Sequence, residues 1–390
     1  MIMLSQQQRI FFEFLRFCIG TVQEVPSSLK GADWRVLYAM ARKQCLVGVL
    51  FDGIKRLPAD VGMDKGLLFQ WMAQNQTLRK ANARLDKAAV EVAEWFGRKG
   101  FRTCVLKGQG NALLYPPGME RTPGDIDLWV DGGDRKVVSF VRSLSPDEKV
   151  CYHHIGFPEY NGVEVEVHFR PSFLFCFRHN RRLQGYYERV MDEQFAHRVK
   201  LGEQGDVAVP KAEFNLIFQL THIFTHLMNE GIGLRQLLDY FFLLKNTDLG
   251  GNTDGDGFLL NTDFTDNTDR IGGNADGVDR RLLQDELRRL GLWEFAGAVM
   301  YIMKEVFGLE DNRLIVPPDV KRGRLVLKEV LEAGNFGQYD KRNWFGHSAL
   351  GHNLQRLYRD MRLVRYFPEE ALSEPFFRIW HFFWRKRIVR

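Results

Sequence analysis

The first hundred residues carry apolar positions with a helical period. Large apolar side chains recur three and four residues apart in the stretches 4–17, 32–57 and 67–98, the spacing that gives an α-helix one apolar face. Two glycines bracket the end of the third stretch, where glycine is a common helix terminator. The pattern predicts an N-terminal helical region over residues 1–99.

The period changes near residue 100. Three short runs rich in β-branched and aromatic residues read as strands, over residues 101–106, 125–130 and 162–169. Helical segments are expected between them, over 108–115, where Pro116 and Pro117 end the helix, and over 134–144. This order of strand, helix, strand, helix and strand predicts a small α/β core within residues 100–210.

A second helical region, residues 211–390, is interrupted by a segment of different composition. Residues 246–279 consist largely of Asn, Thr, Asp and Gly, and the triplet Asn-Thr-Asp occurs four times. Such a segment buries too little apolar surface to offset its ordering entropy, which favours a surface insertion. The whole chain is therefore expected to be an α+β protein, with a small mixed β-sheet core flanked by N-terminal and C-terminal helical regions.

The strongest chemical signal is the run GDIDLWV. Successive side chains of a strand alternate between its faces, so Asp125 and Asp127 project together while Ile126 and Leu128 point into the core. Two carboxylates about 7 Å apart suit magnesium, which prefers oxygen ligands and leaves room for substrate phosphates. A strand end whose acids only face solvent is the alternative.

Two neighbouring segments favour the metal interpretation. In GVEVEVHF, the valines share one face and Glu164, Glu166 and His168 share the other. Upstream, Lys107 and Gly108 stand at the predicted start of a helix, where free backbone N–H groups attract phosphate. A phosphate cradle, two acids and a third acid are the parts required for attack on a nucleoside triphosphate.

Three of these motifs resemble a known family. VLKGQGNALLYP, ERTPGDIDLWV and VEVHFRP are similar to motifs of the uncharacterised bacterial nucleotidyltransferase family, a branch of the DNA polymerase β-like superfamily. The resemblance covers about residues 30–245. It implies metal-binding roles for Asp125, Asp127 and Glu166, and that Gly108 and its neighbours face phosphate. A site for two magnesium ions is expected from this set of parts.

The nucleotide-binding set expected on this basis is Lys107, Gly108, Gln109, Arg121 and Gly124. The wider superfamily has Gly-Ser where this chain has Gly108-Gln109, so a hydroxyl that touches the terminal phosphates is missing and Lys107 is expected to substitute. Arg121 is either a phosphate ligand or an exposed loop arginine.

Further polar residues are expected to lie around the acids. The family motif places its acid two residues before the histidine, which selects Glu166 over Glu164. His168 is expected to support the acids by hydrogen bonding, since magnesium disfavours imidazole, and Arg170 is assigned to the same surroundings.

The helix beginning near Ala212 carries a polar stripe of Gln219, His222, His226 and Asn229. The next helix carries Arg235 and Asp239 among apolar residues. These residues are expected to face the carboxylates and position the nucleotide or acceptor. The alternatives are a buried polar network that fixes the two helices, and a zinc site at His222 and His226.

Charge and composition bear on the partners and the cellular compartment of the protein. A net charge of +5 over 390 residues gives no positive argument for a nucleic-acid partner. Five scattered cysteines and the lack of a leader or bilayer-spanning run predict a cytoplasmic protein. The terminal run PFFRIWHFFWRKRIVR predicts a basic aromatic helix that either packs on the core or contacts an anionic membrane surface or nucleic acid.

The function expected from the sequence is magnesium-dependent transfer of a nucleoside monophosphate, for example AMP from ATP, to an acceptor, with release of pyrophosphate. The acceptor could be a small molecule, a sugar, a protein hydroxyl or an RNA end. A catalytically inactive nucleotide-binding regulatory protein and an RNA-binding module are the alternatives.

Overall fold

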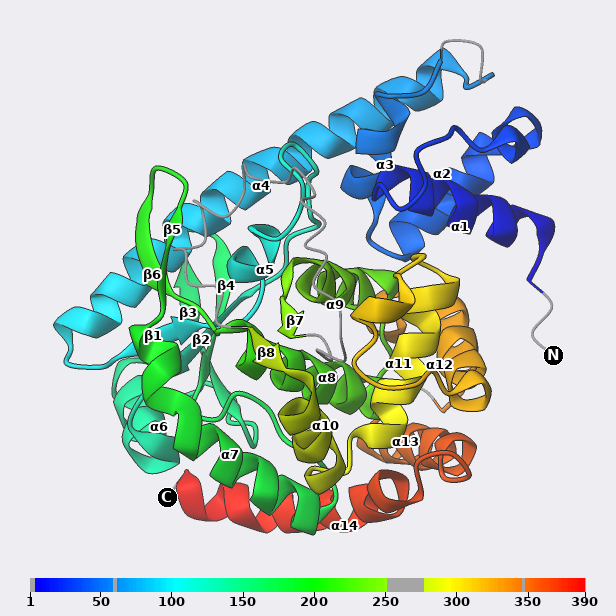
Figure 1. Cartoon of the computed structure of the whole chain (residues 1–390). Coiled ribbons are helices and arrows are strands. Elements are labelled where there is room, and N and C mark those ends of the chain that lie inside the picture. The colour runs from blue at the N-terminus through cyan, green and yellow to red at the C-terminus, as the bar shows by residue number, and fades with distance from the viewer. Residues whose placement is uncertain (1–3, 59–61, 251–276, 346–347, 390) are drawn as a thin grey trace.

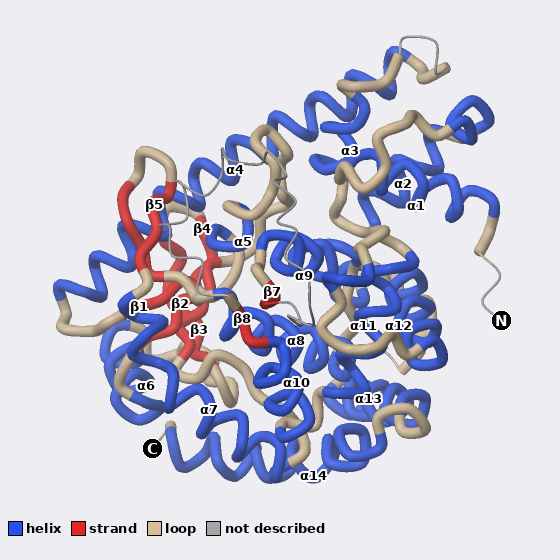
Figure 2. Tube along the Cα trace, in the orientation of Figure 1, coloured by secondary structure: helices blue, strands red, loops and turns tan. Residues whose placement is uncertain are grey.

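The computed structural model describes residues 4–58, 62–250, 277–345 and 348–389. A four-stranded sheet lies against a much larger helical assembly (Figures 1 and 2). This confirms the α+β architecture expected from the sequence. Residues 251–276, which make up most of the predicted insertion, lie outside the described residues.

The N-terminal region forms helices α1 to α4, with bounds Gln6–Cys18, Trp34–Lys43, Val47–Ile54 and Lys65–Arg98, and a short 3-10 helix, Ser27–Gly31. The predicted helix over 32–57 is two helices, because Cys45 adopts a positive φ of 55° between them. The long helix α4 joins two cores: Trp71 is buried with the N-terminal helices, and Phe96 is buried beneath the sheet. Figure 1 shows α4 running from these helices to the sheet.

The sheet has the order β1-β2-β4-β3, with bounds Thr103–Val105, Ile126–Val130, Val163–His168 and His154–Tyr160. Strand β2 is parallel to β4 and antiparallel to β1, and β3 is antiparallel to β4. Strand β3 was not predicted, because Pro158 argues against a strand. An edge strand tolerates proline, and β3 is an edge strand with a register irregularity between Phe157 and Tyr160.

Helices and a hairpin surround this sheet. The predicted helix over 108–115 is only the four-residue α5, Gln109–Ala112, whereas α6, Gly133–Leu144, matches its prediction. Three further features were not predicted: helix α7, Phe177–Ala196, the hairpin of β5, Arg198–Leu201, with β6, Gly205–Ala208, and the short pair of β7, Leu249–Gly250, with β8, Val278–Asp279.

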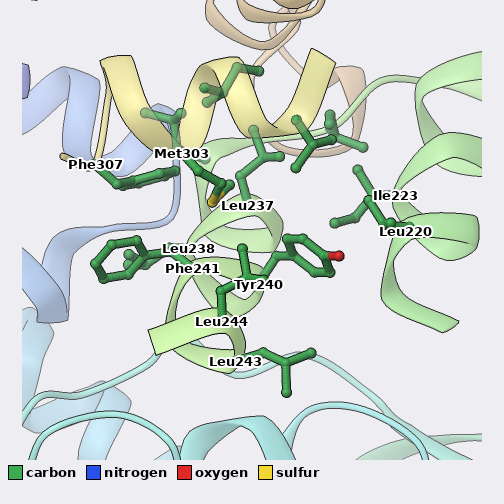
Figure 3. Close-up of a cluster of buried hydrophobic side chains, with 14 of the residues drawn as sticks. Leu220, Ile223, Leu237, Leu238, Tyr240, Phe241, Leu243, Leu244, Met303 and Phe307 are labelled. Atoms are coloured by element: carbon green, nitrogen blue, oxygen red, sulfur yellow. The ribbon is translucent and has the colours of Figure 1, made fainter. Parts of the chain in front are cut away.

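The C-terminal region contains α8 to α14, with bounds Ala212–Asn229, Leu234–Asn246, Arg280–Arg289, Trp293–Glu305, Val320–Ala333, Ala349–Leu363 and Pro368–Ile388, and two 3-10 helices, Asp311–Arg313 and Asn335–Gly337. Helix α9 is central: every residue from Leu234 to Leu244 is buried. Figure 3 shows its side chains among those of α8 and α11. Because α9 is covered on all sides, its charged residues Arg235 and Asp239 are buried with it.

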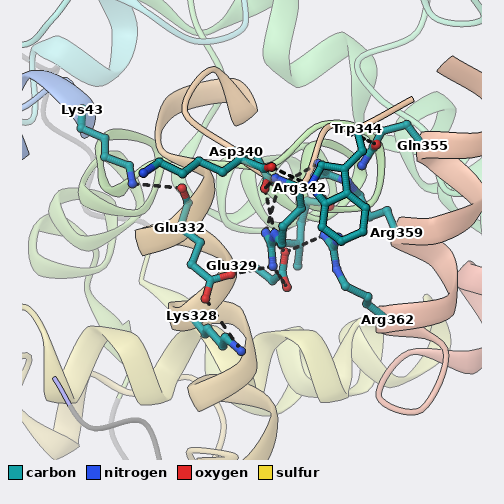
Figure 4. Close-up of polar contacts among 12 residues, drawn as sticks. Lys43, Lys328, Glu329, Glu332, Asp340, Arg342, Trp344, Gln355, Arg359 and Arg362 are labelled. Carbon is teal, nitrogen blue, oxygen red and sulfur yellow. Dashed lines mark hydrogen bonds and ion pairs between the residues drawn. The ribbon is translucent and has the colours of Figure 1, made fainter. Parts of the chain in front are cut away.

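A charged network fixes the C-terminal helices to one another (Figure 4). Glu329 of α12 is buried and accepts hydrogen bonds from Arg342 and from Arg362 of α13. Asp340 accepts a further bond from Arg342 at 2.7 Å. Within the described ranges, no helix is both long enough and apolar enough to cross a bilayer.

Candidate active site

Three carboxylates meet where β2 and β4 lie side by side. The parallel register sets Asp127 directly across from Glu166, and neighbouring strands are about 4.8 Å apart. Asp125 precedes Asp127 by two residues and therefore projects to the same side of the sheet. Ile126 and Leu128 are fully buried on the opposite side, so the predicted alternation of faces is present.

Asp127 is held by two cationic side chains. The Nζ atom of Lys107, which follows β1, lies 2.8 Å from Oδ1 of Asp127. Nε2 of His168 lies 2.9 Å from the same oxygen and 3.4 Å from Oε2 of Glu166. His154 of β3 approaches that Glu166 oxygen at 3.3 Å. Asp127 and Glu166 thus lie in a compact cluster with Lys107, His154 and His168.

The charges of this cluster are unevenly compensated. Burial raises the pKa of Asp127, but Lys107 and His168 outweigh burial and hold that pKa below its usual value. Burial lowers the pKa of His168, yet its bonds to the two carboxylates raise it overall to about 9. The negative charge of Asp127 and burial raise the pKa of Asp125 to about 6. No described side chain forms a hydrogen bond or ion pair with Asp125, which leaves its charge the least compensated.

The cluster lines a cavity of about 650 Å³, a volume typical of sites for small molecules. One wall is the sheet with Lys107 and Gly108, and the opposite wall is formed by α8 and α9. Phe377 of α14 closes another side. Residues from distant parts of the sequence therefore line one partly enclosed cavity with the acids.

Arg121 is buried rather than exposed, so its interpretation as an exposed loop arginine is wrong. Its guanidinium donates to both oxygens of Asp239 at 2.8 Å, and the Tyr115 hydroxyl donates to Oδ1 of Asp239 at 2.7 Å. A bidentate pair of this kind is strong and directional. It ties the loop before β2 to α9, with both residues facing the cavity.

Arg235 is the contrasting case. It lies one helical turn before Asp239, but that carboxylate is occupied by Arg121, and Arg235 forms no ion pair with any described residue. Its Nη1 donates to the carbonyl oxygen of Thr122 at 3.1 Å, while its buried Nε has no partner among the described residues. Its guanidinium lies 5.7 Å from the centre of the Phe336 ring. Gly124 lies close beneath it: a Cβ atom there would be 3.4 Å from Nη1.

The predicted polar stripe of α8 faces the same cavity. Gln219, His222, His226 and Asn229 all line it. Nε2 of His222 lies 3.2 Å from Nζ of Lys107, and Gln219 donates to Asn111 at 3.1 Å. Within the described residues, neither histidine belongs to a cluster of three metal-donor side chains, so the zinc alternative lacks a third ligand.

Two predicted residues lie elsewhere. Gln109 is buried and is not among the residues that line the cavity. Arg170 turns away to pair with Asp134 at 2.6 Å and to lie over the ring of Tyr152. The motifs alone do not reveal the burial of Gln109 or the pairing of Arg170 with Asp134.

Sequence reasoning missed His154, the first residue of the unpredicted strand β3, and His153, which immediately precedes that strand; both line the cavity. Burial lowers the pKa of His154 to about 4 even though the charge of Glu166 opposes this, and burial lowers the pKa of His153 well below its usual value. Both imidazoles are therefore neutral near pH 7. The adjacent histidines were the available signal, but the proline in β3 obscured the strand.

The acids suit a hard divalent cation. Asp127, Glu166 and His168 present donor atoms within 4.8 Å of one another, and Asp125 adds a carboxylate whose raised pKa reflects like-charge repulsion. The carboxylate oxygens of Asp125, Asp127 and Glu166 are the kind of ligand that magnesium prefers. His168 is already committed to both acids, which leaves the carboxylates as the fitting ligands.

Comparison with known proteins identifies the family of the chain. A family model described as uncharacterised nucleotidyltransferase matches residues 30–259, more than half of the chain. The chain belongs to this nucleotidyltransferase family. Among solved structures, it is similar to an antigenic nucleotidyltransferase-like protein from Paracoccidioides brasiliensis, with 16% identity, a TM-score of 0.29, and coverage of 43% of this chain and 78% of that chain. None of the curated proteins matches.

Proposed function

We propose that this nucleotidyltransferase moves a nucleoside monophosphate from a nucleoside triphosphate to an acceptor in a magnesium-dependent reaction. Asp125, Asp127 and Glu166 would hold the metal. The observation that supports this most is that three carboxylates line one cavity, and that Asp125 forms no hydrogen bond or ion pair with a described side chain. Magnesium bound there would activate the attacking oxygen and stabilise the pyrophosphate leaving group.

The phosphates would be bound by side chains more than by a helix terminus. Helix α5 has four residues, too few to supply a substantial dipole. Lys107 and Arg235 instead bring positive charge to the two sides of the acids. Gly108, with a φ of 59°, permits the turn that points Lys107 toward β2 while keeping the backbone free of a side chain.

Glu166 is suited to the acceptor side of the reaction. Burial raises its pKa, but the hydrogen bond from the protonated His168 outweighs burial and brings the pKa below its usual value. The side chain is therefore ionised near neutral pH, while it is more exposed than Asp127. It can accept a proton from an acceptor hydroxyl or serve as a metal ligand.

The test is a turnover assay with the whole protein, magnesium and each labelled triphosphate, supplied with pools of metabolites, proteins or RNA. Magnesium-dependent release of pyrophosphate and transfer of the label to one pool are expected, and Asp125→Asn should abolish both. Failure of the folded protein to bind any triphosphate with magnesium would refute the proposal.

A catalytically inactive nucleotide-binding protein is the second candidate. The observation that favours it is Gln109, which replaces the usual serine and is buried away from the cavity. Magnesium-dependent triphosphate binding with no label transferred to any pool would support this candidate over the enzyme.

A further inference from the structure

The C-terminal helix α14 is apolar on two sides that lie about 100° apart around its axis. On its inner side, Phe377 and Trp384 contact the ring of Tyr152. Its outer side carries four large apolar residues that are each 56–67% exposed: Leu372, Phe376, Ile379 and Phe383. Their spacing of four, three and four places them in one line about 16 Å long, which we call the α14 stripe.

Helix α13, which packs against α14, repeats this spacing. Its residues Leu350, Leu354, Leu357 and Met361 are 40–70% exposed. Soluble proteins seldom leave such regular apolar rows uncovered, and larger exposed apolar areas mark sites of interaction. Figure 1 shows both helices at the periphery of the molecule.

The charge of this region is one-sided. Residues 349–389 contain eight Arg or Lys and four Asp or Glu. Four of the basic residues pair with buried carboxylates: Arg356, Arg359, Arg362 and Arg378. The other four form no ion pair with a described residue: Arg365, Arg385, Lys386 and Arg387. Three of the acids, Asp360, Glu370 and Glu374, are buried, and the exposed Glu369 at the start of α14 pairs with Arg178. The outer surface is therefore apolar and positive.

The basic residues continue the α14 stripe. Lys386 and Arg387 follow Phe383 by three and four residues, so they lie on the same side one turn further along. Neither forms an ion pair with a described carboxylate, and Nζ of Lys386 lies 4.3 Å from the centre of the Phe382 ring. An apolar row that ends in free cations is the pattern of a helix lying in a membrane interface.

We propose that the α14 stripe docks on an anionic lipid surface, with its apolar side chains at the acyl boundary and Lys386 and Arg387 at the phosphates. Protein interfaces are enriched in Arg and Phe but depleted in Lys, so Lys386 is the residue that favours lipid over a protein partner. Single-stranded nucleic acid would use aromatic rings for stacking, whereas Leu372 and Ile379 are aliphatic. Since Phe377 also lines the cavity, docking would hold the candidate active site near the lipid.

The experiment is sedimentation of the full chain with vesicles of phosphatidylcholine alone, or of phosphatidylcholine mixed with phosphatidylglycerol. We expect binding to the mixed vesicles that weakens with salt, and much weaker binding to the neutral ones. Phe376→Asp should reduce binding at least about ten-fold. Replacing Lys386 and Arg387 with Gln should reduce it about five-fold for each charge.

A matched control distinguishes binding through the α14 stripe from non-specific binding through any exposed apolar side chain. Phe69 of α4 is 67% exposed, as is Phe376, and Phe69→Asp should leave vesicle binding unchanged. The proposal is overturned if the folded chain ignores anionic vesicles, or if both Phe variants behave alike. It is also overturned if the chain is a dimer that Phe376→Asp dissociates, or if it binds RNA instead of vesicles. None of these outcomes depends on nucleotidyl transfer.

Discussion

Arg121 and Arg235 line the same cavity, but only Arg121 has a carboxylate partner among the described residues. Replacing each in turn therefore tests whether Arg235 is kept for ligand binding and not for stability. Arg121 has a bidentate carboxylate at 2.8 Å. Arg235 has one carbonyl bond and an unpartnered Nε. Burial and the charge of Arg121 lower the pKa of Arg235, but an arginine stays charged. We expect opposite effects on stability when each is replaced by methionine.

The expected magnitudes follow from these contacts. Arg235→Met removes a desolvated charge that costs several kcal/mol. It also loses a hydrogen bond worth about 1 kcal/mol and a contact with Phe336 worth about 1 kcal/mol. The free energy of unfolding without ligand should therefore stay level or rise by about 1–2 kcal/mol. Arg121→Met leaves Asp239 buried without its cation and should lower it by about 3–5 kcal/mol.

Arg235→Met should weaken triphosphate binding even though it does not lower stability. Loss of a charged hydrogen bond to phosphate costs about 1.5–3 kcal/mol, or roughly a 10- to 150-fold weaker Kd. Urea unfolding gives the stabilities, and calorimetry with magnesium and a triphosphate gives the affinity. The reasoning fails if Arg235→Met is as destabilising as Arg121→Met while triphosphate affinity is unchanged.

Three further outcomes are expected. Asp125→Asn should weaken magnesium-dependent triphosphate binding in calorimetry without lowering Tm, because this carboxylate has no side-chain partner to lose. Glu166→Gln should reduce turnover more than binding, and loss of turnover with Glu164→Gln but not with Glu166→Gln would show that the wrong strand position was chosen. Burial and the charge of Glu374 raise the pKa of Asp360 from 3.8 to about 8. Because the folded state then holds the proton more tightly, stability should fall between about pH 4 and 8, and Asp360→Asn should flatten that part of the urea-unfolding profile.

The parts of the site that sequence could predict depend on local periodicity. Alternation along β2 and β4 fixed the common side of Asp125 and Asp127 and the common side of Glu164 and Glu166, because a strand repeats every two residues. Helical spacing likewise placed the polar stripe of α8 on one face. Each of these features depends on residues only a few positions apart.

The remaining features depend on pairings between distant segments. The parallel register that sets Asp127 across from Glu166 joins residues 39 apart in the chain, and no local pattern specifies it. The pair of Arg121 with Asp239 spans 118 residues. Arg121 and Asp239 are both buried, and their pairing leaves Arg235 without an ion pair. Which of the two arginines pairs with Asp239 depends on how the loop before β2 packs on α9, and that packing exists only in the complete fold.

Two charged side chains that lack an ion pair indicate which ligand the cavity favours. Asp125 and Arg235 each form no ion pair with a described residue, although the charge of Lys107 partly offsets the raised pKa of Asp125, and the charges of Asp239 and Asp125 partly offset the lowered pKa of Arg235. Both line the same cavity, yet they form no ion pair with each other. Burying unpaired charge is costly, so a ligand that brings a cation and an anion together relieves both costs at once. A metal ion alone would leave Arg235 unpaired, and a triphosphate alone would meet the charge of Asp125. The arrangement therefore favours joint binding of the magnesium–triphosphate complex, with each component raising the affinity for the other.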